Sequence, residues 1–189
     1  MTRSRFGRLL LSCGVFLLLA SPASAQDHAY IGAKKCKMCH LKQFKSWEKT
    51  QMANAFELLK PGVKAEAKTG AGLDPEKDYT LETECVSCHV TGHGKEGGFV
   101  DAATTPGLAG VGYEACHGPG GDYVADDKMS LKNKEYKRAD LVAVGMVFPP
   151  TEKQCTGCHN DKSPFFQGFD FETRKAEGTH EHKPLKYQH

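Results

Sequence analysis

The sequence lacks the features that identify most enzymes and most nucleic-acid-binding proteins. Its 189 residues contain no catalytic triad, phosphate-binding loop or carboxylate pair, and the isolated acidic residues are typical of a solvated surface. Neither charge sign dominates, since 25 lysines and arginines stand against 23 acidic residues. A surface with this balance argues against nucleic acid as a partner.

The chain also lacks an apolar run long enough to span a membrane, which takes about 20 residues. The longest run, residues 9–20, follows three arginines and precedes an Ala-x-Ala pattern that ends at Ala25. These are the parts of a secretory signal, so we expect residues 1–25 to be a signal peptide cleaved after Ala25. Residues 26–189 are then one exported, periplasmic domain with 22 basic and 23 acidic residues, a formal charge of −1.

A disulfide framework does not fit the cysteines. Seven remain after residue 25, and six of these form three C-x-x-C pairs that are each followed directly by histidine. The motifs are Cys36-Lys-Met-Cys39-His40, Cys85-Val-Ser-Cys88-His89 and Cys155-Thr-Gly-Cys158-His159. C-x-x-C-H is the attachment signature of c-type haem, in which two thiols form thioethers and the histidine becomes the proximal iron ligand. Structural zinc sites and redox dithiols also use C-x-x-C, but neither requires the histidine.

A fourth copy of the motif has lost its first cysteine. In Tyr113-Glu-Ala-Cys116-His117 the second cysteine and the histidine remain, and tyrosine stands in the first position. One cysteine suffices for one thioether, and the iron–histidine bond does not depend on the other. We therefore expect four haem c groups, with His117 as a fourth proximal ligand. The alternative is a lost haem site with a free thiol at Cys116.

Haem must supply much of the interior of this hydrophilic chain. Four sites leave roughly 40 residues per haem, too few for a separate protein core around each. We expect a mainly α fold with much irregular loop, a compact multihaem cytochrome in which haems form much of the core. Apolar spacing predicts one helix from His40 to Pro61, a capping-box pattern (Thr151-x-x-Gln154) predicts a helix at the last motif, and Asp170 is expected to cap another.

The sixth, distal ligand of each iron has several candidates. They are His28, Met52, His93, His180 and His182. Met52 lies twelve residues after His40, about 18 Å along an unbroken helix, so it would bind a different haem or fill space against a porphyrin. His28 and His93 are equally explained as surface residues. We expect one of His180 and His182 to bind iron, and not both, because alternate residues of an extended chain point opposite ways.

The segments around the motifs form a specific combination. They are Tyr30-Ile-Gly-Ala33, Trp47 to Phe56, Val90-Thr-Gly92, Gly97-Gly-Phe99, Ala115-Cys-His-Gly-Pro-Gly120 and the Ser163-Pro-Phe region. With them the chain resembles the tetrahaem cytochrome c-554 family of exported bacterial electron carriers. The resemblance implies a mostly helical, compact protein with closely stacked haem pairs. Two departures are Tyr113, in place of a cysteine, and Met52, where a distal histidine is common; a methionine ligand would raise that haem's potential.

Two functions compete at this point. The first is electron transfer between periplasmic or membrane-bound redox partner proteins, which six-coordinate irons perform. The second is an enzyme or small-ligand binder that acts on a nitrogen oxide or peroxide at a five-coordinate haem, with the Cys116 and His117 site as the candidate.

Overall fold

The structure is a computed structural model that describes residues 29–177, 179–182 and 184. The expected signal peptide and the candidate ligand His28 lie outside the described residues. Within the described part, no helix has the length and apolar character to cross a membrane.

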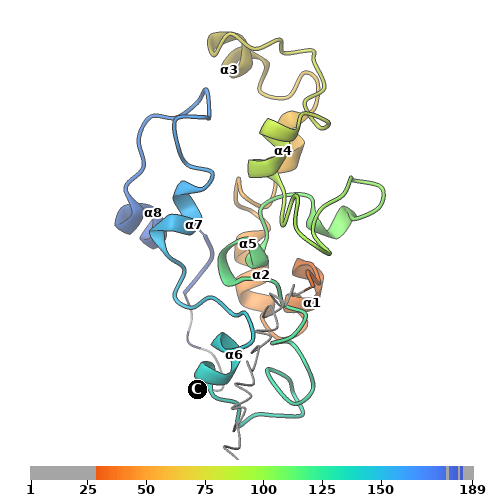
Figure 1. Cartoon of the computed structure of the whole chain (residues 1–189). Helices are drawn as coiled ribbons and strands as arrows, with labels where there is room; N and C mark the ends of the chain where they lie inside the picture. Colours follow the sequence, from red (N-terminus) through yellow and green to blue (C-terminus); the bar gives the residue numbers. More distant parts are fainter. Residues whose placement is uncertain (1–28, 178, 183, 185–189) are drawn as a thin grey trace, which may run out of the picture.

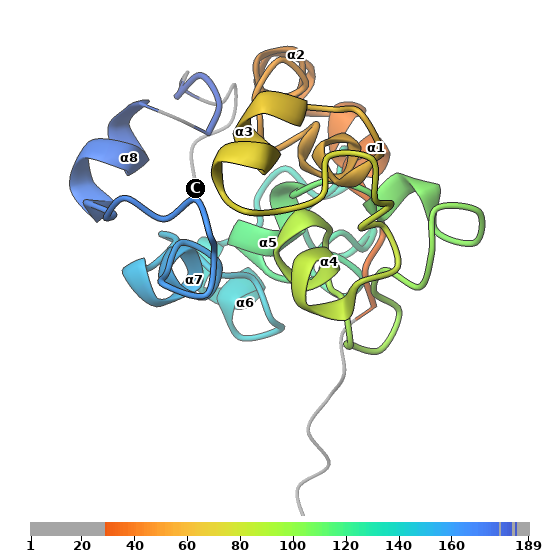
Figure 2. The same cartoon turned by 90° about the horizontal axis from the view of Figure 1, so that it is seen from above.

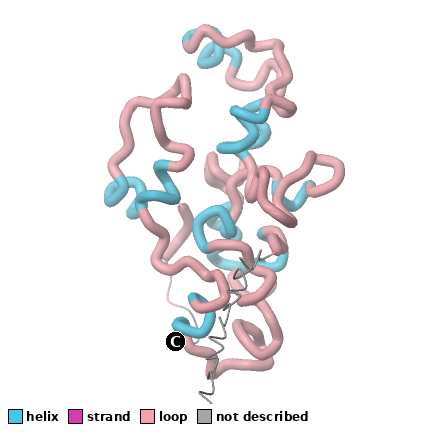
Figure 3. Tube along the Cα trace, in the orientation of Figure 1, coloured by secondary structure: helices cyan, strands magenta, loops and turns pink. Residues whose placement is uncertain are grey.

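Short helices separated by long irregular segments make up the fold (Figure 1 and Figure 3). The helical elements, with η for a 3-10 helix, are α1 (Ala33–Lys37), α2 (Leu41–Trp47), η1 (Ala55–Leu59), α3 (Ala65–Gly70), α4 (Thr83–His89), η2 (Pro106–Leu108), α5 (Tyr113–His117), α6 (Arg138–Val142), α7 (Glu152–Thr156) and α8 (Phe171–Glu177). The described residues form no β-strand, only an isolated bridge between Val90 and Ala109. The prediction of a mainly α fold with much irregular loop is confirmed.

The predicted single helix from His40 to Pro61 is wrong, because α2 ends at Trp47 and η1 begins only at Ala55. Side chains in the intervening turns bind the backbone locally. The Thr50 hydroxyl donates to the Trp47 carbonyl at 2.7 Å, and the Asn54 amide donates to the Thr50 carbonyl at 2.9 Å. Threonine and asparagine compete in this way with helical hydrogen bonds. The helical rise therefore does not set the position of Met52.

The two helix starts that were predicted from capping residues are confirmed. The Thr151 amide donates to the Gln154 side chain at 2.7 Å, and α7 begins at Glu152. The Asp170 carboxylate accepts a hydrogen bond from the Thr173 amide at 2.8 Å, and α8 begins directly after it. Each capping side chain satisfies an amide that lacks a partner in the first helical turn.

The side-chain core is small. One cluster lies around η1 and α4 and consists of Phe56, Leu59, Tyr79, Val86, Val90, Phe99 and Leu108. Across the described residues only 12 hydrophobic side chains are buried. So little buried apolar surface is unusual for a chain of this length and fits an interior in which haem replaces side chains.

The third motif lies at the centre of the molecule. In both views α5 is found between α1 and α2 on one side and α7 on the other (Figure 1 and Figure 2). Helix α5 packs against α1 and against α7, and α1 packs against α2. The third motif, which has lost a cysteine, thereby connects the first motif to the fourth.

A buried carboxylate ties α5 to the chain before the first motif. Glu114 is only 3% exposed, and its oxygens accept backbone hydrogen bonds from Ile31 at 2.9 Å, Gly32 at 2.7 Å and Gly120 at 2.7 Å. Hydrogen bonds to a charged acceptor are stronger than those between neutral groups. A Cβ atom on Gly120 would lie 2.7 Å from the Ile31 side chain, so this approach requires glycine.

Replacing Glu114 with alanine should lower the free energy of unfolding by roughly 3 kcal/mol, because three buried amides lose their acceptor. Glu114→Gln should lower the free energy of unfolding nearly as much. Its side-chain NH2 group would face a backbone N–H at a place where the carboxylate oxygen accepts a hydrogen bond. Urea unfolding of the holoprotein measures both. Glu96→Ala, at an exposed loop position, serves as the control and should change stability by about 0.5 kcal/mol or less. A Glu114→Ala variant as stable as this control would contradict the assignment.

Candidate functional site

A single turn of helix brings the residues of each motif together. The first cysteine, the second cysteine and the histidine occupy positions i, i+3 and i+4, which share one face of a helix. The His40 amide donates to the Cys36 carbonyl at 2.9 Å, and the His159 amide donates to the Cys155 carbonyl at 2.9 Å. The second and third motifs lie within α4 and α5. Each motif thus presents its thiols and its imidazole in one direction, as thioether attachment and iron ligation of one porphyrin require.

Two of the proximal histidines are oriented by backbone carbonyls. The Nδ1 atom of His89 lies 2.6 Å from the Ala55 carbonyl oxygen, and that of His117 lies 3.2 Å from the Val147 carbonyl oxygen. A carbonyl can only accept, so Nδ1 carries the proton and Nε2 keeps its lone pair free. This arrangement fixes the ring and the tautomer of a metal-binding histidine. His89 and His117 are therefore ready to bind iron through Nε2.

Burial favours the neutral imidazole at the first, third and fourth motifs. Burial is the main cause that lowers the pKa of His40, His117 and His159 below the ordinary value. Neighbouring His180 adds to the effect at His40, and Arg174 adds to it at His159. The neutral imidazole is the form that binds a metal ion.

The thiols do not have the character of a redox dithiol. Burial raises the pKa of Cys36 and Cys116 to about 11, and burial with the nearby Cys88 raises that of Cys158 to about 12. Reactive dithiols and zinc ligands need a thiolate and thus a lowered pKa. Among the described residues, no group of three or more histidine, cysteine or acidic side chains converges as a metal-ion site. The raised pKa values of Cys36, Cys116 and Cys158 are thus unlike those of a reactive dithiol.

The last motif lies next to the second and third motifs. Cys88 contributes, after burial, to the raised pKa of Cys158, and Cys155 contributes, after burial, to the raised pKa of Cys116. The Gln154 side chain also donates to the Cys116 carbonyl at 2.7 Å. The attachment points of three motifs therefore meet around α7, and groups bound there would lie close to one another.

Tyr113 replaces the missing cysteine with a partly buried aromatic ring. Its ring centroid lies 5.3 Å from that of Trp47 and 5.8 Å from that of His180. The hydroxyl oxygen is buried, has no hydrogen-bond partner among the described residues and has a pKa raised chiefly by burial. Buried polar atoms without partners are rare and need an explanation. A polar group of a cofactor held by Cys116 and His117 would supply one, so the residues present fit such a cofactor.

His180 is the distal candidate that the structure brings to a proximal histidine. Its ring centroid lies 6.4 Å from that of His117. Metal–imidazole bonds of about 2 Å on each side place two ring centroids roughly 6 Å apart, so the spacing suits an ion between them. Nδ1 of His180 lies 3.0 Å from the Glu181 carbonyl oxygen, which leaves Nε2 free here too.

The expectation that His180 and His182 point opposite ways is wrong. Their rings stack with centroids 5.1 Å apart and an interplanar angle of 26°. The segment bends at this point and is held to α2, because the Glu181 amide donates to the Ser46 hydroxyl at 2.9 Å. A bent segment does not follow the alternation of a strand.

Of the other candidates, His93 and Met52 belong to the described residues. His93 is partly buried in the loop after α4 and makes no ring contact with a proximal histidine of the described chain. Met52 is partly buried, and its carbonyl accepts a hydrogen bond from the Val111 amide at 2.8 Å.

Sequence reasoning missed four contributors to these sites. They are the Ala55 and Val147 carbonyls, the Glu114 carboxylate and the Phe148 ring, which stacks on His117 at 6.3 Å. Carbonyls carry no side-chain signal, and Phe148 is 31 residues away from its partner along the chain. The one available signal was an acidic residue, Glu114, between Tyr113 and Cys116 of the third motif.

Comparison with known proteins gives consistent matches. The family model described as cytochrome c554 and c-prime matches residues 35–118. Cytochrome c-554 of Nitrosomonas europaea is 41% identical over 162 residues, which is 80% of this chain and 68% of that protein. The solved structure of reduced cytochrome c554 from the same organism superposes with a TM-score of 0.76 at 39% identity, covering 85% of this chain and 89% of that one.

The contact between Gly118 and the segment that orients His117 can be tested by substitution. Gly118 has φ +79°, and a Cβ atom would lie 2.3 Å from the Gly145 carbonyl oxygen, so Gly118→Ala must displace the segment that carries the Val147 carbonyl. Gly94→Ala is the matched control, because Gly94 has φ +71° with nothing within 4 Å. Both variants carry the strain of a left-handed alanine. Because it also overpacks the contact, Gly118→Ala should lower the free energy of unfolding by roughly 2 kcal/mol more than Gly94→Ala does, as measured by urea unfolding. Equal losses would show that the contact does not matter.

Proposed function

Because the chain belongs to the cytochrome c554 family, we propose that it is an exported electron carrier with four haem c groups, passing electrons between periplasmic or membrane-bound redox partners. That it is a multihaem c-type cytochrome follows from the family and the three intact motifs. The observation that carries the finer proposal is at the third site, where the ring centroids of His117 and His180 lie 6.4 Å apart, a spacing suited to iron.

Haem c supplies an iron that alternates between the ferrous and ferric states, and the protein supplies its attachment and its ligands. The residues that would hold it are Cys36, Cys39, Cys85, Cys88, Cys116, Cys155 and Cys158 through thioethers, and His40, His89, His117 and His159 through iron. The carbonyl bonds of His89 and His117 keep these ligands in one orientation during oxidation and reduction.

The third site keeps the features that one thioether requires. Cys116 is partly buried, His117 retains its orienting hydrogen bond, and Tyr113 contributes an unpaired buried hydroxyl. An abandoned site gains nothing from these features, whereas an occupied one uses each of them. The single thioether at Cys116 is therefore part of the proposal.

The competing function depends on the coordination of the same site. With His180 as the sixth ligand the iron has no open position and is limited to electron transfer. The buried Tyr113 hydroxyl is the observation that favours a ligand-binding site, because it is a hydrogen-bond donor close to His180. The pairing of His117 with His180 favours the electron carrier.

The haem count can be read from the mass of the mature holoprotein. We expect four covalently bound haems in the wild type, and three in Cys116→Ala, which removes the one thioether of the third site. The alkaline pyridine spectrum should also contain a component at longer wavelength, since one vinyl group stays conjugated with the porphyrin. Tyr113→Cys should remove that component. A wild-type mass with three haems would identify the third site as lost.

The distal role of His180 can be separated from that of its stacked neighbour. His180→Ala should convert one ferric haem from low spin to high spin in electron paramagnetic resonance and allow cyanide to bind there. His182→Ala, which removes an exposed ring two residues away, should leave the spectrum unchanged. A wild-type protein that already shows a high-spin signal at this site, insensitive to His180→Ala, would support the ligand-binding function instead.

A further inference from the structure

Charge is separated along this chain although its total is near zero. Residues 34–49 contain six lysines and one glutamate, a formal charge of +5. Residues 50–189 contain 16 basic and 21 acidic residues, a formal charge of −5. A molecule with this asymmetry presents one positive region to its surroundings, and such a region orients an approaching charged partner.

The positive region covers two neighbouring helices. We call it the lysine surface, and it consists of Lys34, Lys35 and Lys37 on α1, Lys42 and Lys45 on α2, and Lys49 in the turn after α2. All six side chains are exposed, and α1 packs against α2. The Lys37 ammonium lies 4.7 Å from the ring centroid of the buried Phe44, which fixes one lysine across the two helices. The lysines therefore gather on one part of the molecule.

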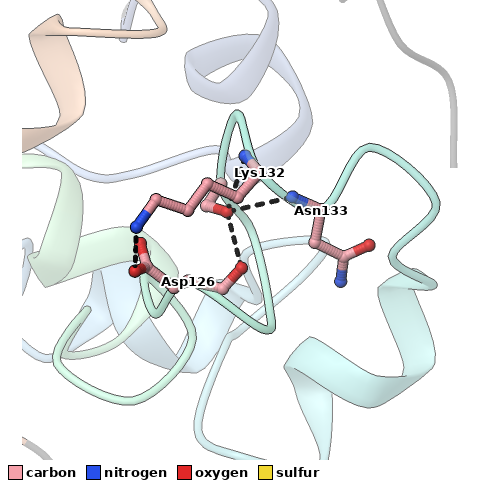
Figure 4. A network of polar contacts seen from close by, with 4 residues as sticks. Asp126, Lys132 and Asn133 are labelled. Atoms are coloured by element: carbon pink, nitrogen blue, oxygen red, sulfur yellow. Dashed lines mark hydrogen bonds and ion pairs between the residues drawn. The ribbon is translucent and has the colours of Figure 1, made fainter.

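These charges are not neutralised within the described part of the chain. None of its ion pairs includes a residue of the lysine surface. The only acidic neighbours that the sequence or a hydrogen bond places there are Glu48 and Glu181. Lysines elsewhere are often paired, as Lys132 is with Asp126 at 2.5 Å in the loop that follows α5 (Figure 4). The lysine surface is thus available to an external anionic group.

Apolar atoms and a haem-attachment cysteine are exposed between these lysines in the sequence. Met38 is 72% exposed and Leu41 is 45% exposed, and both lie beside or between lysines in the sequence. Cys39 is the single exposed cysteine among those that the structure describes. Exposed apolar residues next to charged ones are typical of a transient protein interface. Contact there would reach the first motif directly.

We propose that the lysine surface is the docking site for the acidic face of a redox partner protein, which seats on Met38 and Leu41 beside Cys39. The inference rests on the proposed electron-carrier function and assigns that function a place on the molecule. Charge complementarity speeds encounter and selects the partner, while the apolar centre provides close contact. The partner is identified by its acidic surface.

A protein is favoured over an anionic membrane surface for two reasons. The lysines flank an attachment cysteine in the sequence, so a protein docked there lies close to the first motif and can exchange electrons. Membrane association also requires an apolar face that enters the headgroup region, and only two exposed apolar side chains are found here.

The proposal is tested with the holoprotein on two anionic probes, a gold film coated with poly-L-glutamate and vesicles containing phosphatidylglycerol. The variant Lys34→Glu/Lys35→Glu/Lys42→Glu/Lys45→Glu reverses four exposed charges that form no ion pair. The matched control, Lys95→Glu/Lys137→Glu/Lys153→Glu/Lys162→Glu, makes the same change in net charge at exposed positions elsewhere. We expect binding to polyglutamate to weaken about tenfold or more in the first variant and by less than about threefold in the control. Wild-type binding should also weaken as salt is raised.

Three results would overturn the proposal. They are equal losses in the two variants, unchanged binding in the first variant, and retention on the vesicles at about 0.15 M salt that matches retention on polyglutamate. Voltammetry on the same film separates this inference from the electron-carrier function. Binding without a reversible wave would contradict the electron-carrier function, and a wave in solution without localised binding would contradict the docking site alone.

Discussion

The buried carboxylate of Glu114 connects parts of the chain that local structure would leave separate. It accepts amide hydrogen bonds from residues 31 and 32, before the first motif, and from residue 120, after the third. The described helices have no more than seven residues each, too few to be stable alone. A protein built from such elements depends on long-range ties, and here the tie lies inside a haem-attachment motif. Its removal would affect two sites at once.

The haem-attachment sites also combine short local structure with contacts from distant segments. Each motif uses one helical turn to collect its cysteines and histidine, and at two of them a distant segment then orients the imidazole. The Ala55 carbonyl does this for His89 from 34 residues away, and the Val147 carbonyl does it for His117 from 30 residues away. Because few side chains are buried, the haem groups and these polar contacts together define the interior.

The third site shows how a motif can lose a cysteine and keep its surroundings. Tyr113 fills the vacated position with a ring that packs between Trp47 and His180, so the space is retained. His180 is delivered by a tail segment fixed to Ser46, and the tail also runs beside the lysines of α2. The tail segment that carries His180 is thus bonded to α2, the helix that also carries Lys42 and Lys45 of the lysine surface.

The sequence by itself determined the cofactor, the motif residues, the mainly α class and the capped starts of α7 and α8. These depend on covalent chemistry and on contacts within four residues, which spacing records directly. It did not determine the break after Trp47, where hydroxyl and amide side chains compete with the helix. Only the tertiary structure decided that the ring of His180 lies near that of His117, which carbonyls orient the rings, and that Glu114 is buried. Those outcomes depend on segments 30 to 83 residues apart, and their backbone partners carry no side-chain signal.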